Sequence, residues 1–140
     1  MSAIVKTKKS YNCLVNYRNN CDSNEHKKLI DIFLPMLYQE NKHHLEISVG
    51  NKISDCNFQS TLSMVTTDFI IGLSCWNHEP QLIIKDNTTI RKNIITVINL
   101  TLIKDIQIEV KEDNRINFFE YDIYFNYNNE IDYYIHIIEE

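Results

Sequence analysis

Glycine and proline are scarce in this sequence, since each occurs only twice among 140 residues. Gly50 and Gly72 stand alone, so the chain cannot form a glycine-rich phosphate-binding loop. This absence excludes the common nucleotide-binding motifs. Isoleucine and tyrosine are abundant instead, and such a composition favours strands over helices.

Long apolar runs are missing as well. The first nine residues contain three lysines, and no apolar stretch follows them. An export signal needs an apolar core, and a membrane span needs about 20 apolar residues. We therefore expect a cytoplasmic protein without membrane contact. At 140 residues, 44% of them hydrophobic, we also expect one globular domain over residues 1–140, with 1–10 as a loose end.

The sequence lacks the cysteine spacing of zinc or redox motifs. Its four cysteines are Cys13, Cys21, Cys56 and Cys75, and no pair of them is separated by two residues. Disulfides are rare in proteins that stay in the cytoplasm. We therefore expect all four cysteines to be free thiols.

The histidines show no metal-ligand spacing either. His43 and His44 are adjacent, so in a strand they point to opposite faces and cannot share an ion. His26, His78 and His136 are scattered along the chain. The sequence thus predicts no metal site and no cofactor. No serine or cysteine lies in a nucleophile motif, so no catalytic residue and no enzymatic activity are predicted.

The clearest pattern in the chain is the alternation of apolar and polar residues from Ile98 onward. Three alternating runs cover Ile98–Val110, Phe119–Tyr127 and Ile131–Ile137, and polar turns join them. Alternating runs with short polar connections indicate antiparallel strands. The pattern predicts a three-stranded meander at the C-terminal end.

A helix is predicted from about Asn24 to about Tyr38, with Ser23 as its N-cap. Pro35 lies inside this pattern, and it must bend the helix or end it early because it lacks a backbone N–H. Residues 11–17 alternate and predict a short first strand.

The remaining segments complete the expected fold. Strands are predicted at 45–49, 58–64, 67–76 and 81–85, with a turn at 50–52 and with 67–76 as a central strand buried on both faces. The sequence thus predicts an α+β fold. Its mostly antiparallel sheet has about six to eight strands and a C-terminal three-stranded meander. One N-terminal helix and either a second short helix or a turn at 88–95 accompany the sheet.

Negative charge is concentrated in the same meander. The chain has a formal net charge of −5, but ten acidic residues in 105–140 face only Lys111 and Arg115, so this segment carries −8. Proteins that bind nucleic acids usually have basic surfaces, which argues against that role. A strongly negative sheet face suits a basic protein partner.

The predicted partner-binding residues belong to the acidic segment. They are Glu109, Glu112, Asp113, Glu120, Asp122, Tyr124, Glu130, Asp132, Tyr134 and His136. Tyr124 and Tyr134 share the outward face with several of the carboxylates, and tyrosine buries much area for little entropy. The alternative interpretation is a solvated outer face that keeps the sheet soluble.

Size, acidity and the missing catalytic motifs favour a binding or inhibitor protein. In composition and size the chain is similar to bacterial immunity proteins, whose carboxylates imitate phosphates and occupy the basic cleft of a nuclease toxin. No family motif accompanies this likeness. Two alternatives stay open: a phage-type anti-defence inhibitor, or a small-ligand-binding or enzymatic domain that uses the carboxylates and histidine of the C-terminal hairpin.

Overall fold

The computed structural model describes residues 3–38, 44–54, 57–88, 93–113, 115–116 and 118–139. Its chain divides into two compact units. Unit 1 comprises Met1–Glu40 and Ile70–Thr101, and unit 2 comprises Asn41–Phe69 and Leu102–Glu140. The predicted α+β fold is confirmed, because the described residues form two α-helices and eight antiparallel strands in two sheets. That the chain is a single domain stays a prediction.

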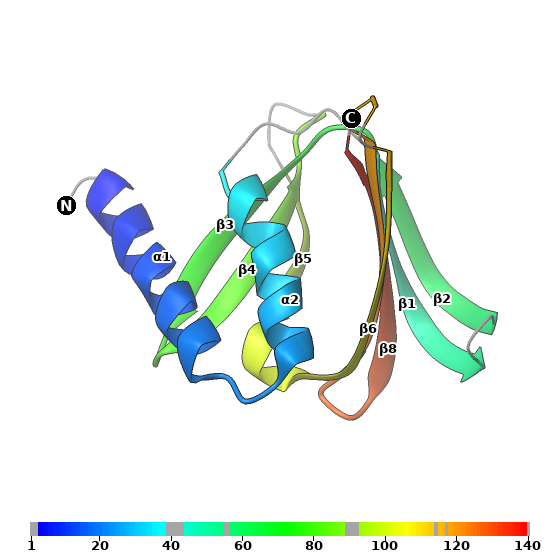
Figure 1. The fold of residues 1–140 in the computed structure, drawn as a ribbon, viewed down its shortest axis with the longest axis horizontal. Helices are drawn as coiled ribbons and strands as arrows, with labels where there is room; N and C mark the ends of the chain where they lie inside the picture. Colours follow the sequence, from blue (N-terminus) through cyan, green and yellow to red (C-terminus); the bar gives the residue numbers. More distant parts are fainter. Residues whose placement is uncertain are drawn as a thin grey trace. The chain divides into compact units, whose positions relative to one another are not determined.

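Unit 1 contains both helices and a small sheet (Figure 1). Helices α1 (Ala3–Asn20) and α2 (Asn24–Phe33) come first, and a 3₁₀ turn over Leu34–Met36 follows them. Strands β3 (Phe69–Trp76), β4 (Glu79–Asp86) and β5 (Ile94–Asn99) then form a three-stranded sheet in the order β3-β4-β5.

Helix α2 begins where the sequence predicts. The Ser23 hydroxyl accepts a hydrogen bond from the His26 backbone N–H at 3.2 Å, which caps the helix. Its buried side chains Leu29, Ile30 and Phe33 recur at helical spacing. Pro35 lies in the 3₁₀ turn, so the proline ends the helix early instead of bending it.

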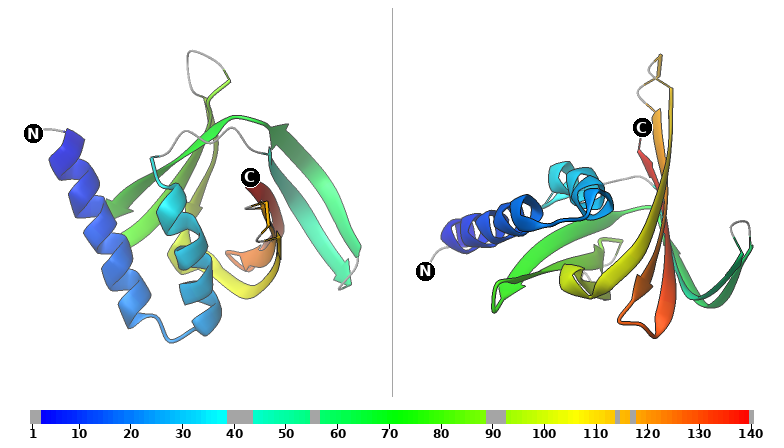
Figure 2. Two further views of the ribbon diagram at one scale, coloured as in Figure 1. Left: turned by 45° about the horizontal axis from the view of Figure 1, so that its top comes forward. Right: turned by 60° about the horizontal axis from the view of Figure 1, so that its bottom comes forward.

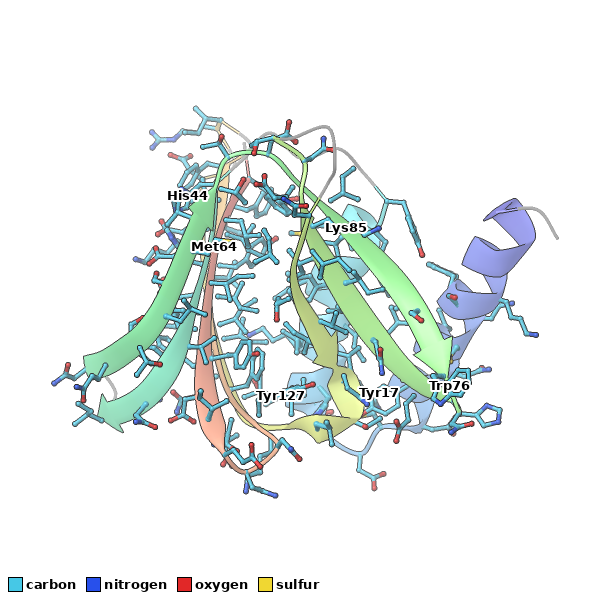
Figure 3. The ribbon with its side chains drawn as sticks, turned by 180° about the vertical axis from the view of Figure 1, so that it is seen from behind. Tyr17, His44, Met64, Trp76, Lys85 and Tyr127 are labelled. Carbon is cyan, nitrogen blue, oxygen red and sulfur yellow. A yellow bond between two sulfur atoms is a disulfide. The ribbon has the colours of Figure 1, made fainter. Side chains whose placement is uncertain are left out.

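Helix α1 replaces the strand predicted at 11–17 and the loose end predicted at 1–10. Leu14 is fully buried, and the hydroxyl of Tyr17, which Figure 3 labels, donates a hydrogen bond to the Leu100 carbonyl oxygen at 3.1 Å. These two residues are three apart and therefore lie on one side of a helix. The alternation over 11–17 predicted a strand wrongly, because the contacts of these residues with distant parts of the chain favour a helix.

A disulfide joins Cys13 of α1 to Cys75 of β3. The expectation of free thiols is wrong for this pair, because the fold of unit 1 brings together two cysteines that lie 62 residues apart in the sequence. Cys21 is a free thiol, as expected. Cys56 lies outside the described residues.

Strand β3 lies at an edge of its sheet and not at the centre, contrary to the prediction for 67–76. The chain after α2 covers part of this edge. Leu37 forms a parallel bridge to Ile71, and the Tyr38 backbone N–H donates to the Ile71 carbonyl oxygen at 2.9 Å. The Tyr38 hydroxyl also donates to the Leu73 carbonyl oxygen at 2.8 Å. An edge strand can therefore be as apolar as a central one.

Unit 2 is a five-stranded antiparallel sheet in the order β2-β1-β8-β7-β6. Its strands are β1 (His44–Ser54), β2 (Asn57–Thr66), β6 (Ile103–Asp113), β7 (Phe118–Tyr127) and β8 (Ile131–Glu139). Strands β6, β7 and β8 form the predicted meander. Strands β1 and β2 form a long hairpin that curves toward its tip (Figure 2).

Two local predictions in this region are wrong. Gly50 lies inside β1 and not in a turn, next to a register shift between Val49 and Gly50. A Cβ atom at Gly50 would lie 2.0 Å from the Gln59 carbonyl oxygen, so glycine permits close backbone approach at a bulge. The run predicted to begin at Ile98 is also interrupted, because a 3₁₀ turn over Leu100–Leu102 separates β5 from β6.

The segment predicted as a short helix or turn at 88–95 lies partly outside the described residues. Ile94 and Ile95 belong to β5, which pairs antiparallel with β4. Among the helices that the structure describes, none is long and apolar enough to cross a membrane.

The disulfide yields a stability prediction. Replacing both Cys13 and Cys75 by serine should lower the free energy of unfolding by about 2–4 kcal/mol, because the bridge closes a long loop and restricts the unfolded chain. Urea denaturation without reductant measures this difference. The control is Cys21→Ser, which leaves the bridge intact. Equal midpoints for wild type and the double variant would contradict the prediction.

Candidate functional site

The two faces of the five-stranded sheet differ in chemistry. One face holds the fully buried side chains Leu45, Ile123, Ile135 and Ile137. The residues between them point to the other face, because side chains alternate along a strand. We call this second face the polar face; on β1, β7 and β8 it carries His44, Glu46, Ser48, Glu120, Asp122, Tyr124, Asp132, Tyr134 and His136.

Strand register aligns these residues in rows across the sheet. Glu46 of β1 lies opposite His136 of β8, and His136 lies opposite Asp122 of β7. In the next row Tyr134 lies between Ser48 and Tyr124. Directly opposed residues approach within about 4.5–5.5 Å, so side chains of one row are in contact range.

His136 is the centre of a charged group that we call the His136 cluster: Glu46, Glu120, Asp122 and His136. The His136 Nε2 atom lies 2.8 Å from Glu120 Oε1 and 4.0 Å from Asp122 Oδ1. On the other side of the ring, Nδ1 lies 3.9 Å from Glu46 Oε2. Only the contact with Glu120 is short enough for a hydrogen bond, and its distance is typical of one.

The His136 cluster is half-buried and rich in negative charge. Side-chain exposure is 15% for Asp122, 16% for His136, 23% for Glu120 and 32% for Glu46. Within the described part of the chain, the ion pairs of these carboxylates all go to His136 and none goes to a lysine or arginine. Partial burial raises the cost of uncompensated charge, so the cluster attracts a cation.

Tyr134 fixes one of these carboxylates. Its hydroxyl donates a hydrogen bond to Asp122 Oδ1 at 2.6 Å. Burial, followed by this hydrogen bond, raises the pKa of Tyr134 well above its usual range. The hydroxyl therefore stays protonated and keeps Asp122 in place, and it cannot serve as a base near neutral pH.

An aromatic group adjoins the cluster. The rings of Tyr124 and Tyr134 stack with centroids 4.7 Å apart, and Phe58 of β2 lies 6.4 Å and 6.2 Å from them. The Lys52 ammonium lies 5.2 Å from the Tyr124 ring centroid, and it also bonds to the Gln107 side chain. Tyr124 can thus receive a cation on its face.

A pocket of about 240 Å³ lies beside the aromatic group. It is lined by Lys52, Asp105, Gln107, Tyr124, Phe125, Asn126, Asp132 and Tyr133. Asp132 has a structural role there, because its carboxylate accepts hydrogen bonds from the Lys52 backbone N–H at 2.8 Å and from Asn126 Nδ2 at 3.0 Å. The Asn126 Oδ1 atom is buried and has no hydrogen-bond partner among the residues that the structure describes.

The structure brings together six of the predicted partner-binding residues on the polar face: Glu120, Asp122, Tyr124, Asp132, Tyr134 and His136. They are half-buried in this structure, whereas the sequence predicted an outward-facing, exposed ribbon. Their carboxylates therefore interact with each other and with His136 more strongly than solvated surface charges would.

Of the other four predicted residues, Glu109 lies opposite Asp122 on the polar face but is exposed, and the remaining three lie away from this group. Glu112 lies opposite Phe119 and therefore on the other face of the sheet. Asp113 forms an ion pair with Arg115 at 3.2 Å, which lowers the pKa of Asp113. Glu130 is exposed in the turn between β7 and β8.

Sequence reasoning missed the contributions of β1 and β2, namely His44, Glu46, Lys52 and Phe58. His44 and Glu46 reach the site because β1 pairs with β8. Lys52 and Phe58 reach it through their contacts with the Tyr124 ring. Figure 3 labels His44 on β1. The sequence signal was weak: His44 and Glu46 are two residues apart and share a strand face, but nothing local indicates their partner strand.

The polar face also contains two sets of possible metal ligands. His44, Glu46 and His136 form the first set, and Glu120, Asp122 and His136 form the second. In each set the ligand atoms all lie within 4.8 Å of one another. The sequence predicted no metal site because residue spacing along one strand does not show which side chains of neighbouring strands lie together.

Comparison with known proteins adds no assignment. No protein-family model matches this chain, and no curated protein or solved structure matches it.

The charge of the His136 cluster predicts a stabilising substitution. Glu46→Gln removes one of three neighbouring negative charges and leaves the hydrogen bonds of Glu120 and Asp122 intact. At about pH 8 the free energy of unfolding should rise by up to about 1 kcal/mol, because the repulsion among the carboxylates falls. Chemical denaturation measures it at low and high salt, and screening should reduce the gain.

Glu130→Gln is the matched control, because Glu130 is exposed in a turn. It should leave stability unchanged. A lower stability of Glu46→Gln than of wild type would show that Glu46 is not repelled by its neighbours.

The raised pKa of Tyr134 predicts an alkaline effect on stability. Above about pH 10 an unfolded tyrosine ionises, while folded Tyr134 keeps its proton, so the folded state binds more protons and stability falls with rising pH. Tyr134→Phe lacks this proton and escapes that part of the fall. The free energy of unfolding of wild type minus that of the variant, measured by urea denaturation, should therefore be constant below about pH 10 and fall above it. A rise of this value above that pH would contradict the assignment.

Proposed function

We propose that this protein is an immunity-type binding protein that neutralises a cationic protein toxin, for example a nuclease, through the polar face of its five-stranded sheet. One observation carries the proposal: three half-buried carboxylates converge on a single imidazole, and none of them pairs with a lysine or arginine among the described residues. A partner's lysine or arginine would supply the missing positive charge.

Partial burial makes this arrangement suitable for binding. Solvated surface ion pairs contribute little, whereas charge pairs that lose water on association can be strong and selective. The Tyr134 hydroxyl already holds Asp122 by a hydrogen bond, and the His136 ring holds Glu120 by another. Carboxylates with fixed positions lose little entropy when a cationic side chain binds them.

The aromatic group supports the same proposal. Tyr124, Tyr134 and Phe58 form a rigid apolar surface beside the charges. Tyrosine and arginine are the residues that most often dominate protein interfaces. Lys52 lies over the Tyr124 ring, which illustrates how a partner's cation can contact these rings. A phage-type anti-defence inhibitor would use the same surface chemistry.

A small-ligand-binding or enzymatic domain is the second candidate function. It is favoured by the pocket of about 240 Å³ and by the buried Asn126 Oδ1 atom that lacks a partner there. A ligand with a hydrogen-bond donor would satisfy this oxygen. The pocket is slightly smaller than a typical drug-sized ligand site, which begins at about 300 Å³.

Co-expression with the products of neighbouring genes tests the proposal. A basic protein should co-purify, and its affinity should fall with salt because charge pairs carry the interface. In the variant Glu120→Gln/Asp122→Asn the complex should lose about 2–5 kcal/mol of binding free energy, measured by calorimetry. Asp132 is left unchanged because its carboxylate holds the Lys52 backbone and Asn126.

The matched control neutralises charge outside the sheet. Asp22→Asn alters an exposed residue between α1 and α2 and should leave the affinity unchanged. Unchanged affinity in the double variant, with the fold confirmed by circular dichroism, would place the interface elsewhere. A small molecule that co-purifies in the pocket, without a protein partner, would favour the second candidate.

A further inference from the structure

We infer that His44, Glu46 and His136 form a binding site for a divalent transition-metal ion of the Zn²⁺ class. The inference goes beyond the proposed function, because all three ligands belong to this chain and no partner is required.

The strands place the three side chains on one face. His44 and Glu46 are alternate residues of β1, and both point to the polar face. His136 lies directly opposite Glu46 on β8. A strand pair can therefore present two residues from one strand and one from its neighbour to a single ion.

The distances suit an ion between these ligands. The ligand atoms of the three residues lie within 4.8 Å of one another, and the two imidazole rings have centroids 5.3 Å apart. The His136 Nδ1 atom and Glu46 Oε2 are separated by 3.9 Å, which is too long for a hydrogen bond. Tetrahedral Zn²⁺ holds its ligand atoms about 3.3 Å apart. Small rotations of these side chains close the difference.

The other side of the His136 ring supports this assignment. Its Nε2 atom lies 2.8 Å from Glu120 Oε1, so Nε2–H donates to the carboxylate. The proton on Nε2 leaves the Nδ1 lone pair directed toward Glu46. Metal-binding histidines usually donate their second N–H to a carboxylate in this way, which orients the ring and raises its basicity. Glu120 is thus a positioning residue.

The second ligand set is less suitable for the same reason. Glu120 and Asp122 already accept hydrogen bonds, from His136 Nε2 and from the Tyr134 hydroxyl respectively. An ion bound at His136 Nε2 would have to replace the proton that Nε2 donates to Glu120. The set of His44, Glu46 and His136 keeps both hydrogen bonds.

The chemistry of the ligands indicates the class of metal. Two imidazoles and one carboxylate suit Zn²⁺ and other late divalent metals, whereas Mg²⁺ and Ca²⁺ prefer oxygen ligands alone. Three protein ligands leave a fourth position open for water or for a group from a bound molecule.

Titration with Zn²⁺ alone, followed by calorimetry, tests the inference on the purified full chain. Wild type should bind one Zn²⁺ per chain and gain thermal stability, and Co²⁺ should produce the visible absorption of a tetrahedral complex. His44→Ala and Glu46→Gln should abolish both effects. Glu120→Gln should weaken binding about 10- to 100-fold, because it removes only the support of His136.

Three control variants make the assignment specific. Asp122→Asn should retain Zn²⁺ binding, since Asp122 belongs only to the second set. Cys21→Ser removes a free thiol and His78→Ala removes an exposed imidazole, and both variants should bind Zn²⁺ like wild type.

Two outcomes would overturn the inference. Absence of Zn²⁺ binding in folded wild type is the first. The second is retention in His44→Ala together with loss in Asp122→Asn, because the ion would then occupy the other ligand set. Circular dichroism of each variant separates loss of the site from loss of the fold.

Discussion

The antiparallel pairing of β1 with β8 is the interaction on which the rest of unit 2 depends. Strand β8 is the central strand of the sheet, and β1 is the element that connects β2 to it. The register places Glu46 opposite His136 and Ile47 opposite Ile135. A slip by one residue would move every side chain of β1 to the wrong face, exposing the buried Ile47 and removing Glu46 from the His136 cluster. Apolar burial on one face thus sets the position of charge on the other.

That charge opposes folding. Binding sites commonly lower the stability of the free protein, because groups that are paired only in a complex stay unpaired when the partner is absent. The hydrogen bonds from Tyr134 to Asp122 and between Glu120 and His136 hold two of the three carboxylates. They fix the geometry and leave the negative charge in place. The remaining carboxylate, Glu46, has one ion pair among the described residues, its 3.9 Å contact with His136 Nδ1.

The meander could be predicted because its information is local. Alternation over β7 and β8 identifies the strands, and short turns identify their pairing. Six residues of the candidate site follow from this pattern, among them Asp122, Tyr134 and His136, because all six belong to these two strands. The residues of β1 could not follow, because the partner of β1 is far away in the sequence. The same limitation explains the Cys13–Cys75 disulfide and helix α1, which is joined to distant residues by this disulfide and by the Tyr17–Leu100 hydrogen bond.

The imidazole of His136 separates two acidic regions that differ in their neighbouring side chains. On the Nε2 side, Glu120 and Asp122 adjoin the Tyr124–Tyr134 stack, which suits an extended cationic side chain such as arginine. On the Nδ1 side, Glu46 and His44 offer one oxygen and one nitrogen, which suits a compact metal ion. An ion bound at Nδ1 leaves the proton on Nε2, so the contact with Glu120 persists. The two regions are therefore compatible: an ion on one side would reduce the negative charge of the cluster and would weaken, without abolishing, its attraction for a cationic partner.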